Sequence, residues 1–126
     1  MTDIDISDIV TGDRVRFHPD TDPRKWWHVI GRDEEHIVAV RQAPFQPRGH
    51  IEYTVTGTLD HAYNGQGPGL VRSSLNTLGG GFNLEGRLEE GAQEILHELA
   101  TGRHELSMRR VIGVTSIEVK GRTLTA

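Results

Sequence analysis

The sequence has no cysteine, no long apolar run and few aromatic residues, which make up 6% of its 126 positions. Without cysteine there are no disulfides, thiolate metal sites or cysteine nucleophiles, as is usual in a reducing compartment. No segment approaches the roughly 20 apolar residues of a membrane helix. The acidic residues 1–10 also do not resemble a signal peptide. We therefore expect a cytoplasmic protein with no membrane partner.

A long block of one charge sign is also missing. The chain has 14 basic and 18 acidic residues, a formal net charge of −4, and residues 1–50 and 51–126 each hold 7 basic and 9 acidic ones. Without a basic tail, non-specific coating of DNA is disfavoured, although a local basic face remains open. The length suits a single domain over residues 1–126, because two domains would each be too small for a core.

Alternating apolar residues predict β-strands over most of the first two thirds of the chain. The pattern is found in residues 14–18, 26–32 and 37–42, and most clearly in residues 51–59. In residues 51–59 the odd positions are apolar or glycine, and the even positions are glutamate and threonine. This alternation is typical of an antiparallel sheet with one face in water, so we expect the threonines to face solvent.

One helix is predicted in the C-terminal half, at about residues 88–101, because apolar residues there recur at helical spacing. Two closing strands are predicted at 105–110 and 112–120. Six or seven short antiparallel strands with one amphipathic helix indicate a mostly β (α+β) fold. It is a small, partly open SH3-like barrel with the helix plugging one end, or a curled sheet with the helix on one face.

A long ordered, glycine-rich loop is predicted at about residues 61–86, and its brief apolar core at Leu70 and Val71 could form one short strand or helical turn. Glycines there would let backbone N–H groups approach an anion, with an arginine and two hydroxyls adding contacts. Under the alternative interpretation the same glycines only make tight turns that need positive φ. The candidate binding residues of this loop are Asn64, Gly65, Gly67, Gly69, Arg72, Ser73 and Ser74.

A second candidate surface combines basic and aromatic residues. Small barrels bind nucleic acid on an exposed strand face, where arginines meet phosphates and aromatic rings stack on bases. Aromatic residues on ordered loops also anchor protein interfaces. The alternative is that one residue of the Trp26–Trp27 pair faces the core and the arginines are only a solvated face. The candidate residues are Arg14, Arg16, Trp27, Arg41, Phe45 and Tyr63.

Motifs for catalysis and metal binding are weak. His97 and Glu98 begin an H-E-x-x-H pattern, but residue 101 is threonine, so the second histidine is missing. No serine lies in a G-x-S-x-G motif, although Asp60 and His61 could orient and deprotonate a serine of the glycine-rich loop. We therefore expect no metal and no cofactor, and an enzyme is disfavoured.

Four segments follow one another in a distinctive order: TGDRVRFHPD (11–20), WWHV (26–29), VRQAPF (40–45) and YNGQGPGLVRSS (63–74). On these segments the chain resembles the small uncharacterised proteins encoded by actinobacterial phages and prophages. The resemblance covers nearly the whole chain, and it implies a phage origin and a bacterial intracellular setting. It implies no activity, cofactor or site residue.

These observations favour a non-enzymatic binding domain that binds a bacterial host protein or associates with itself. A homodimer could form through an exposed strand edge. One alternative is a small nucleic-acid-binding barrel that uses the basic and aromatic residues. A second alternative is a small hydrolase-like enzyme that uses the glycine-rich loop.

Overall fold

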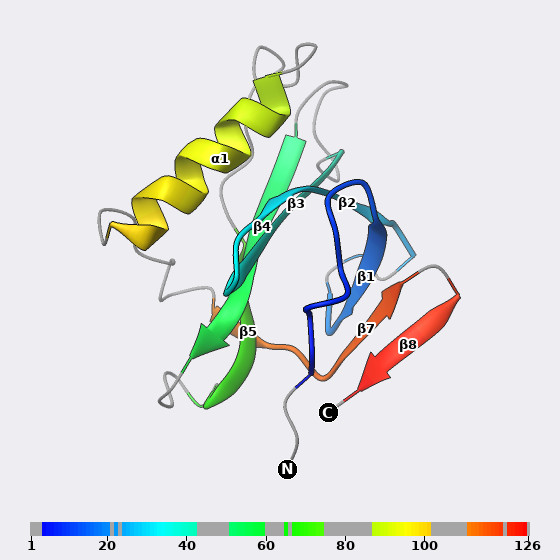
Figure 1. The fold of residues 1–126 in the computed structure, drawn as a ribbon. Helices are drawn as coiled ribbons and strands as arrows, with labels where there is room; N and C mark the ends of the chain where they lie inside the picture. The colour runs from blue at the N-terminus through cyan, green and yellow to red at the C-terminus, as the bar shows by residue number, and fades with distance from the viewer. Residues whose placement is uncertain are drawn as a thin grey trace.

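The computed structural model describes residues 4–20, 22, 24–42, 51–59, 65, 67–74, 87–101, 111–119 and 121–125. In these residues the fold is one antiparallel sheet of eight strands with one helix (Figure 1). The elements are β1 (Arg14–His18), β2 (Trp27–Arg32), β3 (His36–Gln42), β4 (Ile51–Leu59), β5 (Gly69–Ser74), α1 (Arg87–Ala100), β6 (Val111–Gly113), β7 (Ser116–Val119) and β8 (Arg122–Thr125).

The order of the strands shows how the sheet curls. The order is β6-β5-β4-β3-β2-β1-β7-β8, so β6 and β7, which follow each other in sequence, are separated by five strands. Between them, the Val114 N–H donates to Leu70 O of β5 (2.9 Å) and the Thr115 N–H donates to His18 O of β1 (2.8 Å). Two consecutive residues thus bridge β5 and β1. The sheet is curled but not closed, which confirms the predicted mostly β fold class.

The apolar core lies on the inner face of this curled sheet. Phe17 of β1 and Trp27 of β2 meet edge to face, with ring centroids 6.2 Å apart. Residues 4–9 add buried isoleucines to the same cluster. The other buried members from the strands are Val15, Val29, Ile37, Ala39, Leu70, Ile117 and Val119.

Helix α1 packs on the outer face of the sheet, so it does not plug an end of the barrel. Its Ala92 and Leu96 belong to a second buried cluster with Val38 of β3 and Val55 of β4. Figure 1 shows the helix lying beside these strands. The helix approaches β2 closely at Gly31, where an added Cβ would lie 2.9 Å from the Ala92 Cβ. This 14-residue helix is too short and too polar to cross a membrane, and it is the sole helix in the described ranges.

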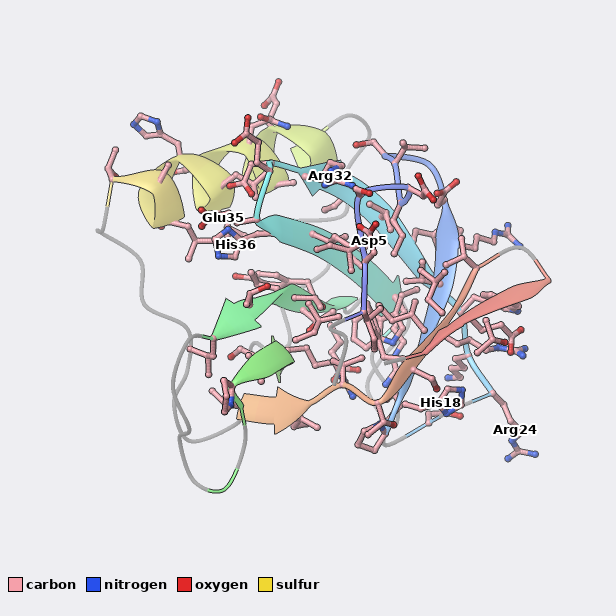
Figure 2. The ribbon with its side chains drawn as sticks, turned by 60° about the horizontal axis from the view of Figure 1, so that its bottom comes forward. Asp5, His18, Arg24, Arg32, Glu35 and His36 are labelled. Atoms are coloured by element: carbon pink, nitrogen blue, oxygen red, sulfur yellow. The ribbon has the colours of Figure 1, made fainter. Side chains whose placement is uncertain are left out.

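Arg32 fixes the N-terminal segment against the sheet. Its Nη1 donates to the carbonyls of Ile6 (2.8 Å), Ser7 (3.3 Å) and Ile9. Figure 2 shows Arg32 near the helix, on the same side as Asp5 of this segment. Because one guanidinium gathers three carbonyl groups, residues 4–9 are held where their isoleucines reach the core.

The sequence predictions hold for most elements, with one division and one inversion. The predicted strand 112–120 is divided into β6 and β7, which are separated by five strands in the sheet. The strands at residues 14–18 and 51–59 have the predicted bounds, and the helix begins and ends one residue earlier than predicted. However, Thr54 and Thr56 are 0% exposed, since the even-numbered face of β4 is the inner face and the odd-numbered face lies towards α1. The predicted strand 105–110 lies outside the described residues.

Candidate functional site

The inner face changes from apolar to charged where β3, β4 and β5 run side by side. Arg41 of β3 is paired in register with Glu52 of β4, and Thr56 of β4 is paired with Arg72 of β5. All four side chains lie on the face that carries Ile37 and Ala39, because alternate residues of a strand share a face. Charged side chains therefore extend the core of the barrel.

Asp20, which follows β1, is the centre of this charged cluster. Its Oδ1 lies 2.8 Å from Arg41 Nη2 and its Oδ2 lies 3.0 Å from Arg41 Nη1, a two-pronged ion pair. The indole N–H of Trp27 donates to Oδ2 at 2.8 Å, and Arg72 Nη2 lies 3.4 Å from Oδ1. The Asp20 side chain is 1% exposed, so this network joins β1, β2, β3 and β5 inside the fold.

Arg41 and Trp27 therefore do not belong to a surface, which corrects the predicted basic and aromatic face. Trp27 is 0% exposed and Arg41 is 4% exposed. The Arg41 guanidinium stacks 4.1 Å above the Trp27 ring, and its Nε donates to Glu52 Oε2 at 3.2 Å. The cation is buried because two carboxylates and a ring compensate its lost hydration.

Burial and charge act in opposite directions on the ionisable groups of this cluster. Burial alone would raise the pKa of Asp20, but hydrogen bonds from Trp27 and Arg41, with the charges of Arg72 and Arg41, hold its pKa below the usual 3.8. Burial lowers the pKa of Arg72, and the nearby Asp20 carboxylate opposes that shift. Asp20 is thus ionised at neutral pH.

The candidate binding residues of the predicted glycine-rich loop lie in two different structural settings. Gly65, Gly67 and Gly69 all have positive φ (80°, 71° and 128°), as the turn interpretation requires. Arg72 and Ser73 instead belong to β5 and are 2% and 0% exposed. Arg72 points inward, where its Nη2 donates to Pro19 O at 3.1 Å, because position 72 lies on the inner face. Ser74 ends β5.

The outer face of β1 and β2 carries the exposed part of the predicted basic surface. Arg14 and His28 are paired in register and both are exposed. Arg16 stacks 4.1 Å above the ring of the half-buried Trp26 and pairs with Glu118 of β7 at 3.4 Å. Trp26 is therefore the partly exposed member of the tryptophan pair, and Trp27 is the buried one. Alternation within β2 could have suggested this, but only together with knowledge of which face is inside.

A pocket of about 400 Å³ opens beside this outer face. It is lined by Gly12, Arg14, Trp26 and Gly121. Gly12 and Gly121 have φ of 99° and 84°, and a Cβ at either position would meet no atom within 4 Å. The pocket thus presents a guanidinium and an indole between two open turns, a combination suited to a carboxylate or phosphate next to an apolar group.

The other predicted residues, Asn64, Phe45, Tyr63, Asp60 and His61, lie outside the described residues. Within the described ranges, no three histidine, aspartate or glutamate side chains are grouped as metal ligands would be. Comparisons with protein-family models, with curated proteins and with solved structures find no match.

Proposed function

We propose that this protein is a phage-type, cytoplasmic, non-enzymatic binding domain that recognises a protein of its bacterial host. The binding surface is the pocket of Gly12, Arg14, Trp26 and Gly121, with Arg16 beside it. The observation that carries the proposal is the exposed Arg14 next to the half-buried Trp26 in a pocket of about 400 Å³.

The chemistry of this pocket indicates the kind of partner. Arg14 forms no ion pair with another described residue, whereas Arg16 is paired with Glu118. Arginine and tryptophan are the residue types that most often dominate the energy of protein interfaces. We therefore propose that the partner presents a segment in which a carboxylate side chain lies beside an apolar or aromatic one.

The test is affinity capture of the tagged protein from an actinobacterial lysate, with and without nuclease treatment, read by mass spectrometry. Arg14→Gln and Trp26→Ala should each lose a host protein that the wild type retains. Gln93→Glu, on the exposed side of α1, is the matched control, because it and Arg14→Gln each change the net charge from −4 to −5. If all variants retain the same proteins, this face is not the binding surface.

Two other functions are separated from host-protein binding by further measurements. Self-association would appear as a concentration-dependent mass in sedimentation without any lysate, and Arg14→Gln would weaken it if the pocket is involved. Binding of nucleic acid is the second candidate function. Its surface would consist of Arg14, Arg16 and Trp26, and would not include Trp27 and Arg41, because these two side chains are buried. It requires that partners disappear on nuclease treatment and that affinity falls steeply with salt.

A further inference from the structure

Trp26 lies on the connection between β1 and β2, one residue before β2 begins. Connections are less constrained than the strands they join, because they lie outside the hydrogen-bonded ladder. The Trp26 side chain is also only half buried, and it lines the pocket of Arg14. Its orientation in that pocket therefore depends on contacts with neighbouring side chains.

Arg16 of β1 supplies these contacts. Its Cζ lies 4.1 Å from the centroid of the Trp26 ring. Its Nη2 donates to the carbonyl of Arg24, two residues before Trp26, at 3.2 Å. Its Nη1 donates to Glu118 Oε2 of β7 at 3.4 Å. One planar guanidinium thus fixes the backbone of the connection, stacks on the indole and is itself held by the neighbouring strand.

A further donor of Arg16 is directed to no oxygen. Its Nε–H is buried and has no hydrogen-bond acceptor among the described residues. Nε is bonded to Cζ, so it also lies close to the Trp26 ring. The face of an aromatic ring attracts a cation and accepts weak N–H contacts. The indole thus compensates a donor that would otherwise be unpaired, which couples the position of the ring to that of the guanidinium.

This stacking leaves another side of the indole for the pocket. Trp26 and Arg14 both line the pocket of about 400 Å³, whereas Arg16 is not one of its lining residues. Arg16 therefore covers a side of the ring that does not face the pocket. Arg14 and Arg16 share the outer face of β1, because they are two residues apart on one strand. The two arginines thus act on one site in different ways.

We infer that Arg16 is a positioning residue, which holds the Trp26 indole so that the partner's apolar group packs on its uncovered side while Arg14 meets the carboxylate. The role in binding rests on the proposed function. A side chain that is fixed before binding loses little conformational freedom on binding, which raises the affinity. Lysine has the charge of arginine but not its planar fork, so it cannot stack on the ring and bond two oxygens at once.

The first test needs no ligand. The chain has two tryptophans, so its ¹H–¹⁵N NMR spectrum has two indole N–H signals, and Trp26→Phe assigns them. In Arg16→Lys the order parameter of the Trp26 indole N–H should fall from about 0.85 to below about 0.6. That of Trp27 should stay high, because its N–H donates to the buried Asp20. Equal order of Trp26 in the wild type and Arg16→Lys would overturn the positioning role.

The second test measures binding of the capped dipeptide acetyl-Asp-Phe-amide from the shift of the Trp26 indole signal. Acetyl-Asn-Phe-amide is the uncharged control and should bind more weakly. Arg16→Lys should weaken binding of the acidic dipeptide about fivefold, although it leaves the net charge at −4. Affinity equal to that of the wild type would overturn the role of Arg16 in binding and show that only its charge matters.

Glu118→Thr separates positioning from charge by the sign of its effect. Removing a carboxylate beside the pocket would strengthen binding of the acidic dipeptide if charge alone decided the affinity. Positioning predicts weaker binding and a lower order parameter for Trp26, because Arg16 loses its support on β7. Stronger binding would overturn the inference. A wild type that binds neither dipeptide would contradict the proposed partner chemistry, whereas the order parameters would still decide whether Arg16 holds Trp26.

Discussion

The two halves of the inner face of the sheet are stabilised by different interactions. The half formed by β1, β2 and β7 is apolar and packs Val15, Phe17 and Ile117 by the hydrophobic effect. The half formed by β3, β4 and β5 adds Ile37, Ala39 and Leu70 to the same apolar cluster. It also buries Arg41 and Arg72, which are held by directed ion pairs and hydrogen bonds. Apolar packing tolerates small changes of shape, whereas a buried charge network fails when one member is removed.

The charged half also explains why residues far apart in sequence act together. Asp20 lies on the connection between β1 and β2, yet it contacts β3 through Arg41 and β5 through Arg72. The Asp20 carboxylate thereby links the β1–β2 side of the curled sheet to the β3–β5 side, and we call this link the Asp20 latch. Arg41 and Arg72, which the sequence analysis assigned to binding surfaces, therefore stabilise the fold.

Replacing Asp20 should have the largest effect. Asp20→Asn removes the anion between two buried guanidinium groups, so we expect a loss of about 3–5 kcal/mol in the free energy of unfolding. Urea denaturation measures this. Asp22→Asn is the control. The Asp22 side chain forms a long, partly exposed pair with Lys25, and the variant keeps the backbone hydrogen bonds of Asp22 with Asp20 and Arg41, so the loss should be less than about 1 kcal/mol. Similar losses in both variants would contradict the latch.

The pH dependence of stability should report the same residue. Because the pKa of Asp20 is lowered in the folded state, its contribution is present above the unfolded pKa of about 3.9 and is lost as the pH falls through the folded pKa. Urea denaturation from pH 7 to pH 3 should therefore show a steeper decline in the wild type than in Asp20→Asn. Parallel curves would show that Asp20 is not the titrating group.

Adding a methyl group at the close contact between α1 and β2 should lower the free energy of unfolding by an intermediate amount. In Gly31→Ala the new Cβ would lie 2.9 Å from that of Ala92, so we expect a loss of about 1–3 kcal/mol through overpacking. The double variant with Ala92→Gly removes the opposing Cβ and should recover part of this loss, less about 1 kcal/mol for glycine in a helix. A thermal melt that leaves Gly31→Ala unchanged would argue against this close contact.

Two neighbouring threonines offer the smallest and most closely matched comparison. Thr54 Oγ1 donates to Ser73 O at 3.0 Å, whereas Thr56 Oγ1 has no acceptor among the described residues. Thr54→Val should therefore cost about 1–2 kcal/mol, and Thr56→Val less than about 0.5 kcal/mol, in chemical denaturation. A larger loss for Thr56→Val than for Thr54→Val would contradict this assignment of the two hydroxyl groups.

Much of the fold followed from the sequence, because alternation is strong in β1 and β4 and the apolar stripe of α1 is regular. β5 was predicted only as one short strand or helical turn within the glycine-rich loop, since Leu70 and Val71 are the only apolar core of that stretch before Leu75. β8 was not predicted, because its four residues contain a single apolar one. Such short strands are fixed by their neighbours more than by their own pattern.

The candidate site was harder to predict, because alternation separates two faces without telling which one is covered. In β4 the threonine face is buried inside the curled sheet and the apolar face lies under α1. For the same reason the sequence analysis named Trp27 as the surface residue, whereas in the structure Trp27 is buried and Trp26 lines the outer pocket. The role of Asp20 depends on contacts with β3 and β5, which local sequence does not encode.

The most direct test of this account compares two arginines that the sequence alone places in one binding surface. Urea denaturation of Arg41→Gln should show a loss of about 3–5 kcal/mol, because Asp20 would be left buried without its main partner. Arg14→Gln should stay within about 0.5 kcal/mol of the wild type, because Arg14 is exposed. Equal losses in the two variants would contradict the division between a structural interior and a binding exterior.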